Sequence, residues 1–237
     1  MDNFPIQTEM TKDDYVIICG DFGGVWTFEN ESEQEKYWLD WLNKKNFTTL
    51  FVDGNHENFT RLYNYPEKKW HGGKVHKIRD SVLHLMRGEI FEIDNKRIFT
   101  FGGASSHDIQ DGILNLDGEE KIYNFRKRGA YFRIRDFSWW DLELPTNQEM
   151  ENGIKNLEKV NYKVDYIISH CCPTSIQALI NPIYKRDILT DYLQQISEKC
   201  TFKKWYFGHY HDYKQVNSQF TLLYENIVPL EYESIFE

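Results

Sequence analysis

Four short runs of mainly apolar residues each end in a glycine or in polar residues. They span 15–19, 47–52, 164–169 and 203–207. Continuous apolar runs, without the alternation of a half-exposed strand, are typical of parallel strands buried on both faces. The pattern therefore predicts four buried parallel strands, and we expect a further apolar segment at 220–224 to close the sheet.

Helical patterns separate the predicted strands. They span 31–45, about 147–159 and about 187–199, and a short helix is expected to end near Tyr63. The first begins with acidic residues and ends with lysines, which complements the helix dipole. At the second, Thr146 and Glu149 form a capping-box pattern. Strands that alternate with helices predict an α/β fold with a parallel sheet and helical crossovers.

The segment from 74 to 102 has a different pattern. Short predicted strands at about 75–79, 82–87, 89–94 and 97–101 are separated by turn residues. Such close spacing indicates a meander, which we expect to form a second sheet. The following segment is less informative, although its charged part at 118–128 favours a helix.

The charge and the apolar content of the chain make some classes of function less consistent with the sequence. The chain has 28 basic and 37 acidic residues and a formal net charge of −9, which disfavours non-specific binding to polyanions such as DNA. It has no apolar run long enough to span a bilayer and no signal-peptide pattern. Because no linker or repeat divides it, we expect a single domain over residues 1–237, located in the cytoplasm with reduced cysteines.

Side chains that can bind metals or move protons follow the predicted strands. In chain order they are Asp21, Asn55, His56, His170, His209 and His211. Ligands bind at the carboxyl ends of strands in open α/β sheets, so we expect these residues to meet. An isolated His-x-His is equally consistent with ordinary surface or core histidines. That alternative does not explain suitable groups at four strand ends. The two histidines at 209 and 211 can face the same way only if the segment is extended.

The same residues lie in motifs that resemble those of the calcineurin-like metallophosphoesterases. The motifs are Gly-Asp-x-Gly-Gly at 20–24, Gly-Asn-His-Glu at 54–57, His170 after an apolar strand, and Gly-His-x-His at 208–211. They occur in the order found in that family and cover most of the chain. The resemblance implies a four-layer αββα sandwich with two divalent metal ions at one edge.

The resemblance also implies a metal-binding role for five residues. Asp21 would bridge both ions, and Asn55, His170 and His209 would complete one site. His211 would belong to the other site. Oxygen and nitrogen ligands in this mixture suit Mn, Fe or Zn.

The implied activity is hydrolysis of a phosphomonoester or phosphodiester. Two metal ions about 3.5–4 Å apart can share the hydroxide that attacks phosphorus. His56 would donate a proton to the leaving alkoxide. The substrate itself cannot be read from the motifs, because specificity in this family lies in the loops.

The chain departs from the family at its first motif, an Asp-x-His after the first strand. No histidine precedes His56, and residues 1–12 have the pattern of a loop. We therefore expect a chain shortened at its N-terminus, without the first strand and helix, that binds one metal ion at most. His211 would then lack its partners and activity would be impaired. A sheet without that strand would expose an unpaired edge, so self-association is also expected.

A second departure is Gly24, where several branches of the family have an aspartate that orients the motif-three histidine. Asp108 or His107 could orient His56 instead, although a polar turn is the simpler interpretation of that loop. Arg61 and Arg79 could bind phosphate with two hydrogen bonds each. The histidines of the meander, His71, His76 and His84, are expected to be surface or strand residues.

A different function is consistent with the same fold. A non-catalytic interaction scaffold could retain a degenerate metal site, and the absent first motif favours it. His56 favours an enzyme, because a binding module would not need it. Metal-dependent hydrolysis of a phosphodiester distinguishes the two.

Overall fold

The first of two large β-sheets contains the N-terminal strands. The structure is a computed structural model that describes residues 4–230. The sheet has the order β1-β2-β5-β4-β3, with β1 Tyr15–Ile18, β2 Thr48–Phe51, β3 Glu67–Trp70, β4 Gly73–Arg79 and β5 Val82–Leu85. β1, β2 and β5 are parallel, whereas β4 and β3 are antiparallel additions. β1 lies at the end of the sheet and all its residues are half-buried, while those of β2 are buried.

The second large sheet contains the C-terminal strands. Its order is β12-β13-β11-β10-β7-β6, with β6 Glu89–Ile93, β7 Lys96–Phe101, β10 Tyr166–Ser169, β11 Lys204–Phe207, β12 Lys214–Gln215 and β13 Phe220–Leu222. The four central strands are parallel, and β6 and β12 are antiparallel edges. The predicted closing segment is therefore present as β13, but β12 lies outside it.

The prediction that residues 75–101 form one meander is wrong. β4 and β5 belong to the first sheet, and β6 and β7 belong to the second. β5 pairs in parallel with β2, with Leu83 opposite Leu50, and all four residues of β5 are buried. The chain then crosses to the other sheet through a turn at Gly88, where φ is +75°. Short turns between strands do not specify which sheet each strand joins.

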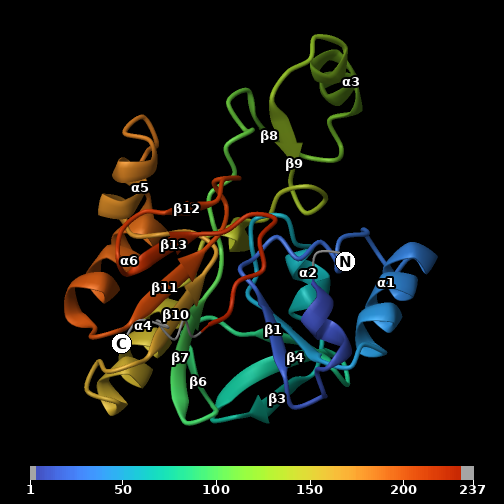
Figure 1. Cartoon of the computed structure of the whole chain (residues 1–237). Helices are drawn as coiled ribbons and strands as arrows, with labels where there is room; N and C mark the ends of the chain where they lie inside the picture. The colour runs from blue at the N-terminus through green and yellow to red at the C-terminus, as the bar shows by residue number, and fades with distance from the viewer. Residues whose placement is uncertain (1–3, 231–237) are drawn as a thin grey trace.

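The two sheets pack face to face, and helices cover their outer sides (Figure 1). Leu50 and Leu83 of the first sheet share one buried cluster with Ile98 and Ile168 of the second. The helices α1 Glu33–Asn43 and α2 Phe59–Leu62 lie on the first sheet, and α4 Asn147–Lys159, α5 Thr174–Ile180 and α6 Ile188–Lys199 lie on the second. The fold is thus the predicted four-layer α/β sandwich.

The helix starts follow from their capping residues. Thr146 and Glu149 form the predicted capping box of α4, and Ser32 and Glu35 form another at α1. Each cap satisfies backbone N–H groups that have no partner within the helix. In the described part of the chain, none of the helices is long and apolar enough to cross a membrane.

A small third unit projects from one end of the sandwich (Figure 1). It consists of β8 Gly112–Leu114, α3 Glu119–Lys127 and β9 Phe132–Ile134, with its own cluster around Leu114, Ile122 and Ile134. The expected helix within 118–128 is α3. The short 3-10 helix η2 Asp141–Glu143 then leads the chain back to α4.

Candidate metal centre

The loops after four strands bring four predicted metal ligands together. They are Asp21 after β1, Asn55 after β2, His170 after β10 and His209 after β11. The Nε2 atom of His170 lies 3.3 Å from Asp21 Oδ1 and 3.3 Å from Asn55 Oδ1. The ring centroids of His170 and His209 are 5.1 Å apart. Both large sheets therefore contribute to one polar cluster at the carboxyl ends of their parallel strands.

Asp21 is held by the backbone of the loop that follows β2. Its Oδ1 accepts hydrogen bonds from the N–H groups of Asn55 and His56, each at 3.1 Å. Gly54 permits this approach, because a Cβ there would lie 2.0 Å from Asp21 Oδ1. Burial opposes the charge of Asp21, but His170 and the His56 N–H outweigh it and hold the pKa of Asp21 below its usual range.

His170 has one ring nitrogen fixed and the other directed at the cluster. Its Nδ1 donates to the carbonyl oxygen of Cys19 at 2.7 Å, so Nε2 faces Asp21 and Asn55. Burial alone would lower the pKa of His170, but the adjacent Asp21 carboxylate raises it. The favoured proton on Nε2 occupies the place that a cation would take between these ligands.

His209 and His211 differ in their surroundings. Their φ angles are +70° and +49°, so the segment is not extended and the two rings do not alternate as on a strand. The His209 ring is next to those of His170 and His107, and burial lowers its pKa well below the usual value. His211 is exposed and stacks on Tyr224 at 5.1 Å. The role of His211 in a second metal site stays a prediction.

His56 lies beside the cluster with its ring half-buried. Burial lowers its pKa, and Asp21 opposes that effect. Among the described residues, no side chain forms a hydrogen bond with the ring. Asp108 instead pairs with Arg133, and His107 stacks on Tyr184 and lies against the His209 ring at 4.7 Å between centroids. Neither of the two candidate orienting residues therefore makes a hydrogen bond to His56.

The donor atoms fit part of one metal site. Within residues 4–230, no group of three or more His, Cys, Asp and Glu side chains is arranged to hold a metal ion. Two such side chains, Asp21 and His170, are in contact, and the third close ligand is the amide oxygen of Asn55. Oxygen and imidazole nitrogen together suit a borderline divalent cation. His209 stands next to this trio, and binding of one metal ion at most stays a prediction.

A buried ion network behind Asn55 was not evident from the sequence. Asp53 accepts hydrogen bonds from Arg87 Nε at 2.9 Å and from His84 Nε2 at 3.0 Å, with Asp53 fully buried. His84 in turn is 2.9 Å from His76 between their Nδ1 atoms, and the two rings stack. The end of β2, which leads into Asn55, is thereby tied to β4 and β5.

Acid is expected to destabilise the protein through this network. Burial, with repulsion from His84, lowers the pKa of His76 to about 4. Because the ordinary value is about 6.5, the unfolded chain binds the proton first as the pH falls. Stability should then fall between about pH 6.5 and 4, by up to about 1.4 kcal/mol per pH unit.

Urea unfolding at several pH values tests this prediction. The free energy of unfolding should fall less steeply with decreasing pH for His76→Gln than for the wild type. His71→Gln, on an exposed turn, is the matched control, and equal slopes for His76→Gln and wild type would contradict the assignment.

The two arginines considered for phosphate binding are engaged elsewhere. Arg61 pairs with Glu35 at 2.9 Å. Arg79 contacts Asp40 at 2.8 Å and Glu31 at 2.6 Å. Both arginines thus anchor the start or the surface of α1, and neither belongs to the metal cluster.

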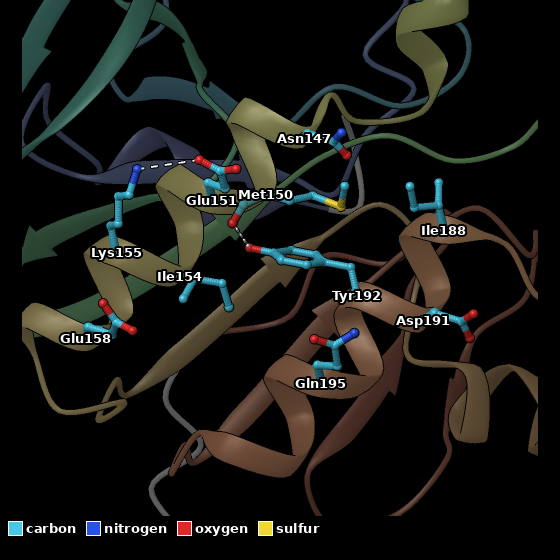
Figure 2. Close-up of a pocket in the computed structure, with 10 residues that line it drawn as sticks. All are labelled: Asn147, Met150, Glu151, Ile154, Lys155, Glu158, Ile188, Asp191, Tyr192 and Gln195. Carbon is cyan, nitrogen blue, oxygen red and sulfur yellow. Dashed lines mark hydrogen bonds and ion pairs between the residues drawn. The ribbon is translucent and has the colours of Figure 1, made fainter.

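A groove of about 570 Å³ lies between α4 and α6 on the outer helical layer (Figure 2). Figure 2 shows the Tyr192 hydroxyl donating to the Met150 carbonyl at 3.0 Å, next to the Glu151–Lys155 ion pair. None of the predicted ligands lines this groove. The candidate centre is therefore located by the polar atoms that meet at the strand ends, and not by this groove.

Comparison with known proteins gives one informative similarity. No known family profile matches the chain. The chain is similar to a lariat debranching enzyme. That protein, from Schizosaccharomyces pombe, is 21% identical over 236 residues, covering 89% of this chain. The chain spans 45% of the length of that relative. Similarity at this level supports the metallophosphoesterase superfamily and no finer placement.

Proposed function

We propose that this protein is a metal-dependent phosphoesterase. The observation that carries the proposal is the meeting of Asp21, Asn55 and His170 around one point, with His56 next to Asn55 in the chain. A binding module would need the ligands but not a half-buried imidazole beside them. The substrate would be a phosphomonoester or phosphodiester.

In this proposal, some of the side chains would bind a metal ion, and His56 would transfer a proton. A bound divalent cation would supply Lewis-acid activation of water and of the phosphate oxygens. Asp21, Asn55 and His170 would hold it, with His209 as a further ligand. His56 is mainly neutral near pH 7 because burial lowers its pKa. An anionic phosphate next to the ring would favour its protonated form, which can donate to the leaving oxygen.

The similarity to the S. pombe protein supports the reaction class. The name of that relative says that it debranches lariats. For this chain, which covers less than half of it, we propose the broader class of phosphoester hydrolysis. The hydrolysis assays described below, with a phosphodiester and a phosphomonoester, test which type of ester is cleaved.

A non-catalytic scaffold remains the second candidate. The exposed position of His211 on Tyr224 and the lack, within the described chain, of a cluster of three His, Cys, Asp or Glu ligands favour it. A scaffold would bind a metal ion weakly or not at all and would not turn over phosphoesters.

Hydrolysis assays separate the two candidates. Metal-stripped protein should gain activity on bis-p-nitrophenyl phosphate or p-nitrophenyl phosphate when Mn²⁺ is added, and lose it again with chelator. The same additions without protein are the control. If Mn²⁺ binds but neither ester is cleaved above that control, the scaffold function replaces this proposal.

A further inference from the structure

The side chain of Asn55 is held by a chain of buried hydrogen bonds. Its Nδ2 donates to Ser106 Oγ at 3.2 Å, and Ser106 Oγ donates to Glu143 Oε2 at 2.7 Å. The backbone N–H of Ser106 donates to the same Oε2 atom at 3.2 Å. These contacts join the loop after β2, the loop after β7 and η2.

The contacts of Ser106 and Glu143 assign a direction to each hydrogen bond between Asn55, Ser106 and Glu143. Glu143 Oε2 accepts from the backbone N–H and the hydroxyl of Ser106. Burial raises the pKa of Glu143 to about 8, and the proton that this favours would sit on Oε1, which has no hydrogen-bond partner among the described residues, so Oε2 stays an acceptor. The hydroxyl proton of Ser106 is directed to Glu143, which leaves Ser106 Oγ as an acceptor toward Asn55. Asn55 must therefore turn its NH₂ group to Ser106 and its Oδ1 to His170. In the opposite orientation, two acceptor oxygens would face each other.

Burial of the three side chains and the anchoring of η2 hold this series of hydrogen bonds in one orientation. Asn55, Ser106 and Glu143 are 4%, 5% and 1% exposed, so water cannot replace a lost partner. η2 is fixed by Arg87, whose Nη2 donates to the Leu142 carbonyl at 2.7 Å. The same guanidinium binds Asp53 through Nε, close to Asn55 in sequence. Both ends of the hydrogen-bonded chain are thus attached to one buried arginine.

We propose that Ser106 and Glu143 are positioning residues that hold the carbonyl oxygen of Asn55 toward the metal ion. The inference rests on the proposed metal site. Partners that orient a ligand typically contribute a factor of about 10–100 to metal affinity. If the pair were only structural, its loss would change the stability of the protein without changing metal affinity.

The test is the affinity for Mn²⁺, measured by the electron paramagnetic resonance signal of the free ion. Ser106→Ala should weaken Mn²⁺ binding about 10–100-fold, because Asn55 loses the acceptor that fixes its orientation. Ser105→Ala, the same substitution one residue earlier, should bind as the wild type does. Urea unfolding without metal verifies that each variant is folded.

Two substitutions at Glu143 make the test independent of Ser106. Because Oε2 only accepts, Glu143→Gln can place its carbonyl oxygen there and should keep Mn²⁺ affinity within about threefold of wild type, well short of the loss that removing an orienting partner causes. Glu143→Met has no acceptor and should lose affinity as Ser106→Ala does. Unchanged affinity in both Ser106→Ala and Glu143→Met would overturn the inference. Failure of the wild-type protein to bind Mn²⁺ would instead overturn the proposed metal site.

Discussion

Asp21→Asn is expected to weaken Mn²⁺ binding at least about 100-fold, which is the upper end of the loss caused by removing an orienting partner. The asparagine can still accept the backbone N–H groups of Asn55 and His56 through its side-chain oxygen, as Asp21 Oδ1 does at 3.1 Å. The loop should therefore keep its conformation while the negative charge is lost. Titration calorimetry with Mn²⁺ measures the affinity, and hydrolysis of bis-p-nitrophenyl phosphate should fall with it at limiting metal.

Asp108→Asn provides the matched control for this prediction. It removes a carboxylate from the neighbouring loop, where Asp108 pairs with Arg133 and makes no contact with the ligand trio. Its Mn²⁺ affinity should remain close to that of the wild type. An Asp21→Asn protein that binds Mn²⁺ as tightly as the Asp108→Asn protein would show that Asp21 is not a ligand.

His56→Ala is expected to lower kcat by about 10²–10⁴-fold for esters with a poor leaving group, the usual contribution of a general acid. Its Mn²⁺ affinity should be unchanged, because His56 contacts Asp21 only through its backbone N–H, which alanine retains. The defect should depend on the leaving group. p-Nitrophenolate needs little protonation, so the loss on bis-p-nitrophenyl phosphate should be smaller than on a dialkyl ester.

The leaving-group comparison is also the control for His56. Metal affinity and unfolding free energy of the variant establish that the centre is intact. A defect of equal size on both esters would mean that His56 does not donate the proton, and that its role is in binding or packing against Trp26, whose ring is 6.1 Å from its own.

Sequence patterns predicted most of the layers because apolar runs and helical periods report burial directly. The edge strand β3 was missed because its residues, Glu67–Trp70, are mainly charged and exposed. Charged edge strands resist pairing with other chains and have no apolar period to detect. The meander prediction failed for another reason: β5 gains its burial from a distant partner, β2.

The candidate site was predictable only as far as residue type and strand position specify it. The clustering of Asp21, Asn55, His170 and His209 agrees with the rule that parallel strands present ligands at their carboxyl ends. The partners of Asn55 were not predictable, since Ser106 is 51 positions away and Glu143 a further 37. Their serine and glutamate side chains have no distinguishing local pattern. The left-handed backbone at His209 and His211 likewise follows from the folded loop and not from the His-x-His motif.

Gly54 leaves no space for a side chain next to Asp21. A single methyl group at this position would collide with Asp21, and a Cβ at Gly20 would lie 2.2 Å from the Nδ1 atom of His170. The main chain at these two glycines thus lies directly against Asp21 and His170. A substitution at Gly54 or Gly20 would therefore displace Asp21 or His170 and disturb the proposed metal centre, even though neither glycine is a proposed ligand.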